Sequence, residues 1–588
     1  MNHDKICVTD AWYPSKDEGV VMPGIAAPWY ALYPEGVEHG LRTGIRNAME
    51  LFQASLRSNP DAEAISYFDG TLTYKSLDDE ARALAAALSQ RGLVHGDRLG
   101  ICLQNTPHFV IAVLAAWYLG MAVVPINPMY RVDELAFVVD DAGLAVLIVE
   151  TGSGEDIAAE VLELRPHVLA FAASPDDYQR RADDRVLPSV PGPGVLPSLG
   201  REIETHRKAS FARAEIQPSD VAFITYTSGT TGRAKGAVNH HAAAAYAGDT
   251  YRNWVPLVST DRILGLAPMS GTTGLITGLV ATLAAGACYV LHYRFQHGVI
   301  RDAIIEHRPT FVVAPPTLYI ALLDDPLLTP EDLSSLTKTY CGGAPVPPTL
   351  VSRWRERFGG EIRTAYGLTE ATGPTHLAPV GASIPVDPET GALAIGVPVP
   401  GTDARIVDTT GADVQVGELG ELVIRGPQVV RGYWRNEDAT EAAFVDGWLR
   451  TGDLVRMSSI GWFFLVDRIK DIIIASGWNV VPREVEDVLY QHPDVREVAV
   501  VGIPHPYRGE TVRAYVSTRS DVPSVTVAEL TSFVRERLAV YKCPTEIEFV
   551  TELPKSNNGK ILKRRLRDDA MSSVRENPLA DAQRHERN

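Results

Sequence analysis

The segment Tyr226–Gly236 reads Tyr-Thr-Ser-Gly-Thr-Thr-Gly-Arg-Ala-Lys-Gly and follows an apolar, β-branched run that begins at Val221. It holds three glycines, four Ser or Thr hydroxyls and two cations. Glycines let backbone N–H groups approach an anion, hydroxyls donate further hydrogen bonds, and Lys235 adds a mobile positive charge. Because an alanine-rich stretch from His240 onward indicates a helix, we expect a phosphate-binding loop between a strand and a helix.

This loop differs from a Walker A loop at two positions. A Walker A loop has Gly before its Lys and Ser or Thr after it. Here those places hold Ala234 and Gly236. A P-loop ATPase is therefore an alternative that the sequence disfavours.

Further motifs follow the loop in a fixed order. They are Tyr366-Gly-Leu-Thr-Glu370, Gly447-Trp-Leu-Arg-Thr-Gly-Asp453, Asp467-Arg-Ile-Lys-Asp471 running into Ser476-Gly-Trp-Asn-Val480, and Leu553-Pro-Lys-Ser-Asn-Asn-Gly-Lys560. Together with the loop they resemble the adenylate-forming superfamily, which includes acyl-CoA synthetases, luciferase-like ligases and the adenylation domains of peptide synthetases. The resemblance spans residues 45–567. It implies an α/β fold, with a large N-terminal body of layered sheets and helices and a small mobile α+β C-terminal domain.

Four segments are expected along the chain. Residues 1–44 form an irregular extension with prolines that prevent a long helix. Residues 45–467 form the large AMP-binding domain and residues 468–567 the small mobile domain, because the charged segment Asp467–Asp471 separates two bodies with their own apolar patterns. Residues 568–588 are polar and charged and are expected to be a frayed tail.

Composition excludes several classes of protein. At 588 residues the chain should form two or more domains. A formal net charge of −18 argues against a nucleic-acid partner, since phosphate backbones are bound mainly by Lys and Arg. The 5 cysteines contain no CxxC pair, which disfavours a zinc site and a disulfide framework and favours a reducing cytoplasm.

Two apolar runs, Val110–Val124 and Leu275–Leu291, are shorter than the ~20 residues that a bilayer requires. Each is expected to be a buried helix that turns at a glycine, Gly120 or Gly286, into a strand. We expect no transmembrane segment and no signal peptide. Peripheral membrane contact and the choice between monomer and homodimer stay open.

The resemblance implies roles for the polar residues. A carboxylate that attacks the α-phosphorus of ATP is repelled unless cations screen the two anions. The catalytic residues are expected to be Lys560, which bridges the acyl carboxylate and the α-phosphate, together with Thr230 and Glu370. Magnesium is assigned to Glu370 and Thr230, since Mg²⁺ takes few protein carboxylates and keeps waters. The nucleotide-binding set comprises Thr227, Ser228, Gly229, Thr230, Thr231, Gly232, Lys235, Tyr366, Gly367, Thr369, Asp453, Arg468 and Lys560.

Within that set, the resemblance implies that Tyr366 stacks on adenine, Thr369 contacts the α-phosphate, and Asp453 accepts hydrogen bonds from the ribose hydroxyls with help from Arg468. Lys470 occupies the hinge position. Rotation about it would withdraw Lys560 after adenylation and bring in the turn that faces CoA. The residues of that turn are Ser476, Gly477 and Trp478.

The acyl pocket is assigned to His240, Gly271, Gly342, Gly343 and Ala344. Relatives commonly carry His or an aromatic residue where Gly271 stands, so this glycine could open the pocket for a bulkier acid or shift that role to His240. Cys341 is interpreted as packing, because nothing in the sequence suggests a paired His.

These features predict an ATP-dependent acyl-CoA ligase for an apolar carboxylic acid, a medium or long fatty acid being favoured. Its cofactors and substrates are Mg²⁺, ATP, coenzyme A and a small-molecule carboxylic acid. One alternative passes the acyl-adenylate to a carrier protein or another acceptor, and another activates an aryl or alicyclic acid. A scaffold protein that keeps the fold without activity is disfavoured, since Lys560 and Glu370 are both present.

Overall fold

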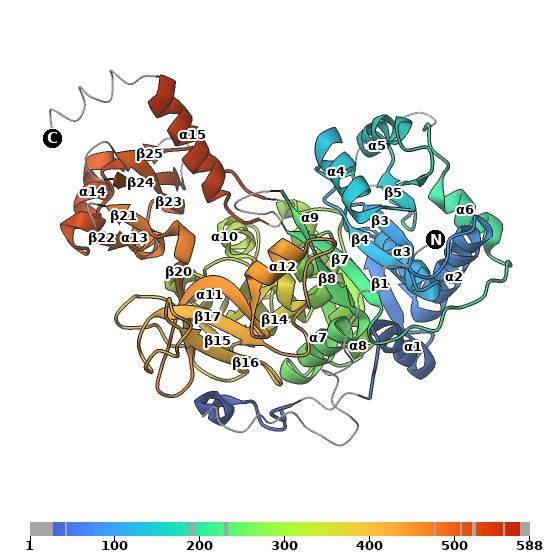
Figure 1. Cartoon of the computed structure of the whole chain (residues 1–588), viewed down its shortest axis with the longest axis horizontal. Helices are drawn as coiled ribbons and strands as arrows, with labels where there is room; N and C mark the ends of the chain where they lie inside the picture. The colour runs from blue at the N-terminus through green and yellow to red at the C-terminus, as the bar shows by residue number, and fades with distance from the viewer. Residues whose placement is uncertain are drawn as a thin grey trace.

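The computed structural model describes residues 27–40, 44–181, 183–187, 194–227, 233–475, 478–505, 509–519, 525–556 and 559–576. A large body of sheets and helices carries a smaller domain at one end, where α13, α14 and β23–β25 gather (Figure 1). The expected α/β fold class, with a large N-terminal part and a small C-terminal domain, is confirmed.

One sheet of the large body carries the phosphate hairpin at its edge. Its strand order is β6-β5-β3-β4-β7-β8, and all neighbours are parallel except β7 and β8. The strands are β3 (Arg98–Cys102), β4 (Ala122–Pro125), β5 (Val146–Glu150), β6 (Leu169–Ala173), β7 (Val221–Thr227) and β8 (Lys235–His240). The helices around it are α2 (Tyr74–Gln90), α3 (Pro107–Tyr118), α4 (Val132–Ala142), α5 (Ser153–Glu163) and α6 (Leu199–His206).

The largest sheet has the order β16-β17-β19-β20-β15-β14-β13-β12-β11-β9-β10-β1-β2, with β18 beside β19. Strands β1, β10, β9, β11, β12 and β13 are parallel, so their carboxyl ends share one edge, where ligands of α/β proteins usually bind. The strands are β1 (Glu63–Tyr67), β2 (Gly70–Thr73), β9 (Arg262–Leu264), β10 (Cys288–Leu291), β11 (Phe311–Ala314), β12 (Lys338–Gly342), β13 (Arg363–Leu368), β14 (Gly373–Leu377), β15 (Ala394–Pro398), β16 (Asp403–Val407), β17 (Gly420–Arg425), β18 (Phe444–Val445), β19 (Trp448–Met457) and β20 (Phe463–Arg468).

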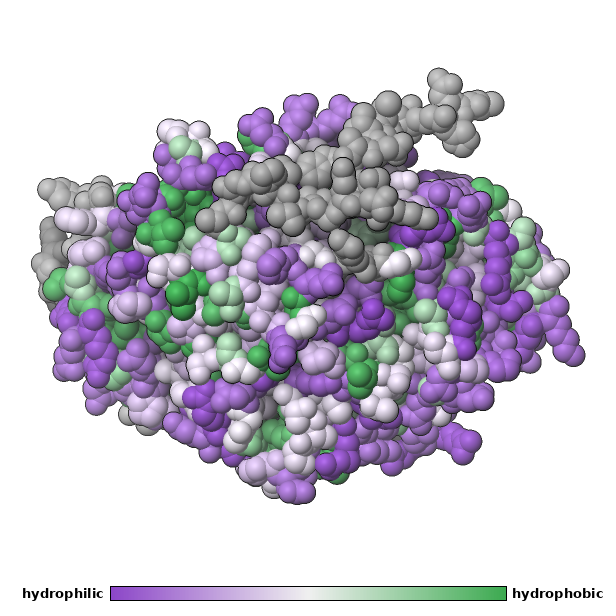
Figure 2. All heavy atoms as spheres, turned by 90° about the horizontal axis from the view of Figure 1, so that it is seen from below, coloured by the Kyte–Doolittle hydropathy of each residue, from purple (hydrophilic) through white to green (hydrophobic). Residues whose placement is uncertain are grey.

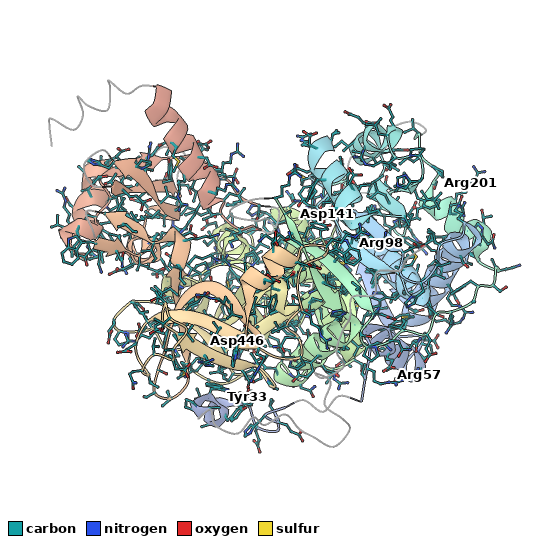
Figure 3. The ribbon with its side chains drawn as sticks, in the orientation of Figure 1. Tyr33, Arg57, Arg98, Asp141, Arg201 and Asp446 are labelled. Atoms are coloured by element: carbon teal, nitrogen blue, oxygen red, sulfur yellow. The ribbon has the colours of Figure 1, made fainter. Side chains whose placement is uncertain are left out.

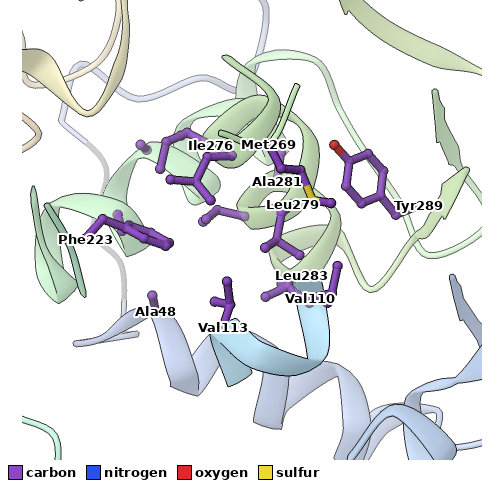
Figure 4. Close-up of a cluster of buried hydrophobic side chains, with 14 of the residues drawn as sticks. Ala48, Val110, Val113, Phe223, Met269, Ile276, Leu279, Ala281, Leu283 and Tyr289 are labelled. Atoms are coloured by element: carbon purple, nitrogen blue, oxygen red, sulfur yellow. The ribbon is translucent and has the colours of Figure 1, made fainter. Parts of the chain in front are cut away.

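Helices pack against these sheets and bury a continuous apolar core. Figure 4 shows one part of it, where Val110 and Val113 of α3 face Leu279 of the π-helix η2. These helical elements are α1 (Ala48–Ser58), α7 (His241–Trp254), η2 (Thr273–Val280), α8 (Ala281–Ala285), α9 (His297–His307), α10 (Pro316–Asp324), α11 (Pro348–Phe358), α12 (Glu437–Ala443) and the 3₁₀ turns η1 (Pro28–Leu32), η3 (Thr369–Ala371) and η4 (Ile469–Asp471).

The small domain has a core of its own, with Val485, Leu489 and Val500 buried at its centre. Its helix α14 begins at a capping box in which Thr526 and Glu529 satisfy each other's backbone N–H groups. Its elements are β21 (Ile473–Ala475), β22 (Trp478–Val480), α13 (Pro482–Leu489), β23 (Val495–His505), β24 (Gly509–Thr518), α14 (Val527–Arg535), η5 (Val540–Lys542), β25 (Glu546–Phe549) and α15 (Lys563–Glu576).

Both apolar runs are buried helices that turn into strands, as expected. The first is α3 followed by β4, with φ of 68° at Gly120, and the second is η2 and α8 followed by β10, with φ of 66° at Gly286. Such positive φ values favour glycine. Among the described residues, no helix is both long and apolar enough to span a membrane. The face in Figure 2 shows hydrophobic residues scattered among hydrophilic ones.

Two expectations are corrected. The phosphate loop does not lead from a strand directly into a helix: it joins β7 to the antiparallel β8, and α7 begins only at His241. The charged C-terminal stretch is also not frayed from Asp568, because α15 continues through it to Glu576. Charge alone suggested a tail, but Leu566 and Ala570 bury an apolar stripe of α15 against the small domain.

The N-terminal extension packs on the large body where it is described. Trp29 is buried against Phe463, with ring centroids 5.8 Å apart. Tyr33, labelled in Figure 3, donates a hydrogen bond of 2.7 Å to the carbonyl of Pro398. The extension therefore contributes apolar contacts to the sheet that also carries β20.

Candidate active site

The β7–β8 hairpin presents the phosphate loop. Thr227 and Lys235 are the last pair before the loop. The predicted loop residues Ser228, Gly229, Thr230, Thr231 and Gly232 lie outside the described residues. The hairpin is braced from the side by Asp141 of α4 (Figure 3), which accepts a hydrogen bond of 2.5 Å from the Tyr226 hydroxyl. Lys235 is thereby held at the loop end of a fixed hairpin.

The Glu370 turn lies beside this hairpin. Tyr433 donates a hydrogen bond of 2.8 Å from its hydroxyl to Glu370 Oε1, and Lys235 Nζ lies 5.3 Å from the centroid of the same ring. Gly367 just upstream has no room for a side chain, since a Cβ would lie 2.0 Å from the Gly373 carbonyl oxygen. The structure therefore brings the predicted Glu370 and Lys235 together around one tyrosine.

The donor set at Glu370 suits a metal that arrives with phosphate. Within the described residues, no group of three or more His, Cys, Asp or Glu side chains could hold a metal ion alone. Mg²⁺ commonly uses one or two carboxylates together with substrate phosphates and waters. A single carboxylate beside Lys235, at the start of β8, fits that pattern.

Asp453, Tyr366 and Arg468 form a second group. Asp453 is 1% exposed and accepts a hydrogen bond of 2.5 Å from the Tyr366 hydroxyl at Oδ2. Arg468 is its cross-strand partner on β20, with Nε 3.0 Å from Oδ1. Burial raises the pKa of Asp453, and the nearby Arg468 charge opposes this shift.

Asp453 Oδ1 keeps a free acceptor position. It contacts Arg468 through charge but accepts no aligned hydrogen bond from the described residues. A buried acceptor of this kind is suited to a hydroxyl donor such as a ribose hydroxyl, because a buried carboxylate oxygen without a hydrogen bond is costly.

Lys560 of the small domain lies close enough to this group for the charges of Arg468 and Asp453 to act on it. Its turn is fixed on the large domain by Thr317 of α10, which donates a hydrogen bond of 2.9 Å to the Gly559 carbonyl. The side chain still meets solvent at the edge of the interface, yet protein surrounds it on most sides. This crowding lowers the pKa of Lys560 to about 8, and repulsion from Arg468 adds to it while Asp453 opposes it. Residues 557–558 of the turn lie outside the described residues.

The predicted hinge lies in η4. Burial and the Arg468 charge lower the pKa of Lys470. Just beyond it, Arg483 at the start of α13 donates to the carbonyls of Leu465, at 2.7 Å, and Val346, at 3.1 Å. Across the domains, Arg519 forms an ion pair of 2.7 Å with Asp324 of α10. These contacts hold the small domain with Lys560 beside Asp453.

The predicted CoA-facing turn is elsewhere on the small domain. Ser476 and Gly477 lie outside the described residues. Trp478 is 60% exposed and packs against Tyr541 with ring centroids 5.1 Å apart. In this arrangement the structure does not bring Trp478 into the Asp453 group.

The predicted acyl-pocket residues fall into two sets. Gly271 precedes Thr272, whose hydroxyl donates a hydrogen bond of 3.1 Å to Thr369, so this segment adjoins the Glu370 turn. Gly342 ends β12, and Gly343 and Ala344 follow it at the same sheet edge. A Cβ on Gly342 would lie 2.2 Å from the Ala365 carbonyl oxygen, whereas Gly343, with φ of 78°, has open space.

His240 is not part of that group. It ends β8, paired with Val221 at the opposite end of the hairpin from the phosphate loop. Its Nδ1 lies 2.7 Å from the Ser219 carbonyl oxygen, and burial lowers its pKa. Alternation along a strand points His240 and Asn239 to opposite faces, and Asn239 is the residue that faces Thr369. His240 is therefore withdrawn from the acyl pocket.

Comparisons with known proteins match this geometry. Residues 52–434 match the model of the AMP-binding enzyme family, and residues 484–560 match that of the AMP-binding enzyme C-terminal domain. The chain belongs to the AMP-binding enzyme family. This is a family of acyl-CoA and adenylate-forming ligases, so the predicted family and the predicted class of acid–thiol ligase are confirmed.

This AMP-binding enzyme is 35% identical to a long-chain-fatty-acid–CoA ligase of Bacillus subtilis, over 92% of this chain and 98% of that protein. It is also 35% identical to a feruloyl-CoA synthase of Amycolatopsis, over 87% and 96% of the two chains. Among solved structures it resembles an anthranilate CoA ligase in complex with anthranoyl-AMP, with a TM-score of 0.81, 27% identity and coverage of 90% and 98%. Relatives thus include both fatty-acid and aryl-acid ligases.

Several residues of the AMP-binding enzyme site were not found from sequence. Tyr433 contacts Glu370, Arg483 donates a hydrogen bond to strand β20 just before the hinge, and Asn239 binds the Thr369 turn. A tyrosine or an asparagine outside a recognised motif carries no local signal of such contacts, and nothing in the sequence shows which carbonyl groups Arg483 binds. Cys341, by contrast, is fully buried, which raises the pKa of its thiol and agrees with a packing role.

Proposed function

We propose that the protein is an ATP-dependent acyl-CoA ligase that acts on an apolar carboxylic acid, with a medium or long fatty acid as the favoured substrate. In the first step the acid's carboxylate oxygen attacks the α-phosphorus of ATP, and pyrophosphate leaves. In the second, the CoA sulfur attacks the acyl carbon of the adenylate, and AMP leaves. The observation that carries the proposal is the docking of the Gly559 turn of the small domain on Thr317 of the large domain. This docking places the charge of Lys560 near the ion pair of Asp453 and Arg468.

Each group has a separate part in adenylation. Asp453 Oδ1 accepts from the ribose, while Lys235 and the phosphate loop hold the triphosphate. Tyr366 stacks on adenine and Thr369 contacts the α-phosphate. Lys560 places its charge between carboxylate and α-phosphate, where repulsion is greatest in the transition state. Mg²⁺, held by Glu370 and Thr230, would offset the charge of the phosphates.

Transfer to CoA uses the other face of the small domain. Trp478 is already exposed at its surface, so rotation about Lys470 would bring the 476–478 turn to the acyl-adenylate and withdraw Lys560. Two half-reactions that need different groups at one place are a known reason for such a movement.

The fatty-acid assignment is supported by the long-chain-fatty-acid–CoA ligases among the relatives, of which one from Escherichia coli O157:H7 is 32% identical over 93% of this chain. Gly271 supports it also, because a small residue leaves room for an acyl chain. An aryl acid is the second candidate, favoured by the feruloyl-CoA synthase at the same identity as the Bacillus relative.

A panel of acids separates the two candidates. Saturated acids of increasing chain length, ferulate, benzoate and anthranilate are compared by kcat/KM for AMP release with CoA present. The fatty-acid proposal predicts the highest values for medium or long chains. Highest values for an aromatic acid would replace it with the second candidate, and pyrophosphate exchange without use of CoA would indicate a different acceptor.

Lys560→Ala tests the site. It should lower adenylation by roughly 10²–10³ while leaving transfer from supplied acyl-AMP active, because one preorganised contact is lost in one half-reaction. Arg565→Ala is the matched control, since Arg565 belongs to the same basic stretch and is exposed. Equal loss of both half-reactions in Lys560→Ala would contradict the assigned role.

A further inference from the structure

Asn239 uses all of its side-chain hydrogen-bonding groups to join the neighbouring strand β7 to the distant Glu370 turn. It lies on β8 and is 2% exposed. Its Oδ1 accepts a hydrogen bond of 2.9 Å from Thr225 of β7. Its Nδ2 donates to the Thr369 carbonyl, at 3.2 Å, and to the Thr372 hydroxyl, at 2.9 Å. A buried amide bonded in this way fixes the relative position of its partners.

One of those partners has a strained backbone. Thr372 ends the η3 turn with φ of 48°, in the left-handed region, and is fully buried. A β-branched residue rarely adopts this conformation and keeps it only where surrounding contacts impose it. The Thr372 backbone N–H donates a hydrogen bond of 3.1 Å to the Thr369 carbonyl oxygen, which Asn239 also binds. Asn239 therefore supports both ends of the turn that carries Glu370.

The same strand carries the phosphate-binding lysine. Lys235 and Asn239 are four residues apart on β8, so alternation places them on one face. Lys235 lies over Tyr433, whose hydroxyl bonds to Glu370, and Asn239 bonds to the turn on either side of Glu370. The β7–β8 hairpin and the Glu370 turn are thus linked at two positions on β8, Lys235 and Asn239.

We propose that Asn239 is a positioning residue that fixes the Glu370 turn against the phosphate hairpin and thereby sets the affinity for the metal–nucleotide complex. The inference rests on the proposed function, since it takes Glu370 as the magnesium ligand. Residues that orient a metal ligand from behind typically change metal affinity or activity by about 10–100-fold when replaced.

The key comparison uses the strain at Thr372. Asn239→Leu keeps the volume and removes every hydrogen bond to the turn. Thr372→Gly lets that position adopt positive φ without support, because glycine has no Cβ. If Asn239 acts by holding this backbone, then adding Thr372→Gly should restore much of the Mn²⁺ affinity that Asn239→Leu loses. Asn47→Leu is the control for loss of a buried asparagine, since Asn47 is 6% exposed and caps α1.

The readouts separate position from stability. Binding of Mn²⁺ in the presence of a non-hydrolysable ATP analogue is measured by electron paramagnetic resonance, and amide hydrogen exchange is followed across residues 369–373. Tm and transfer of the acyl group from supplied acyl-AMP are measured in parallel. Asn239→Leu should weaken Mn²⁺ binding by about tenfold or more and speed exchange in the turn. The double variant Asn239→Leu/Thr372→Gly should return to within about threefold of Thr372→Gly alone.

Other outcomes overturn the inference in distinguishable ways. If Glu370→Gln weakens Mn²⁺ binding but Asn239→Leu does not, the positioning role fails and the metal assignment stands. If neither does, both fail. If Asn239→Leu and Asn47→Leu lower Tm and transfer alike, and Thr372→Gly restores nothing, Asn239 is a structural residue only.

Discussion

The rate of adenylation is expected to fall at alkaline pH because one side chain, Lys560, loses its proton. Its pKa is lowered to about 8, mainly because the surrounding protein desolvates its ammonium group and next because Arg468 repels it. Only the protonated lysine can screen two anions. Adenylation should therefore be lost as the pH rises through about 8, and an arginine at this position should abolish that loss because arginine stays protonated.

The size of the fall follows from the titration. About half of the Lys560 side chains are charged at pH 8 in the free protein and about one tenth at pH 9, so kcat/KM should fall about fivefold between pH 8 and 9 and about tenfold per pH unit above that. Unfolding driven by Lys560 cannot explain this fall. Its pKa is lower in the folded protein than the ordinary 10.5, so its deprotonation adds stability as the pH rises between about 8 and 10.5.

The assay is acid-dependent exchange of labelled pyrophosphate into ATP between pH 6 and 10, for the wild type and Lys560→Arg. Arginine will lower the rate at pH 7 because its geometry differs, but its profile should stay flat above pH 8. Transfer from supplied acyl-AMP serves as the control, since Lys560 has no assigned part in it. The reasoning is refuted if Lys560→Arg shows the same alkaline fall as the wild type, or if the wild type shows none up to pH 10.

Three further outcomes are expected. Glu370→Gln should raise the magnesium concentration needed for half-maximal adenylation, since an amide keeps the shape but removes the charge that faces the metal; an unchanged titration would refute the assignment. Gly271→His should narrow acid acceptance, lowering kcat/KM more for bulky acids than for slim ones; an equal loss for both would make Gly271 a turn residue only. Gly342→Ala should destabilise the protein by about 1–3 kcal/mol or more, because its Cβ would meet the Ala365 carbonyl at 2.2 Å. Gly343→Ala, in open space, should cost about 1–2 kcal/mol from its positive φ alone; denaturant unfolding that ranks the two the other way would contradict this.

The motif residues were assigned through their resemblance to a known family, which could be recognised because each motif is a short, continuous segment. Asp453 and Arg468 were assigned to one ribose from separate motifs, and the register of β19 and β20 makes them neighbours. Gly120 and Gly286 were predicted as helix-to-strand turns from composition alone, since positive φ is a property of the single residue.

What the sequence did not predict depends on contacts between distant segments. Asn239 has partners more than a hundred residues away, and its strand pattern gives no sign of them. His240 was assigned to the pocket as a neighbour that could take over the role of the side chain missing at Gly271, but strand alternation turns it to the other face. The helix through Asp568 was missed because its few apolar residues lie within a run of charges, and only the docked surface of the small domain shows what they cover.

The contacts that hold Lys560 beside Asp453 include the Arg519–Asp324 ion pair, whose side chains are about one third exposed. Charges at such a surface are screened over about 10 Å at 0.1 M salt and about 3 Å at 1 M. The contacts of Asp453 itself are buried and far less sensitive. Raising the salt concentration should therefore shorten the time that the small domain stays in this arrangement. It should also change which half-reaction limits turnover, at salt concentrations that leave the nucleotide site intact.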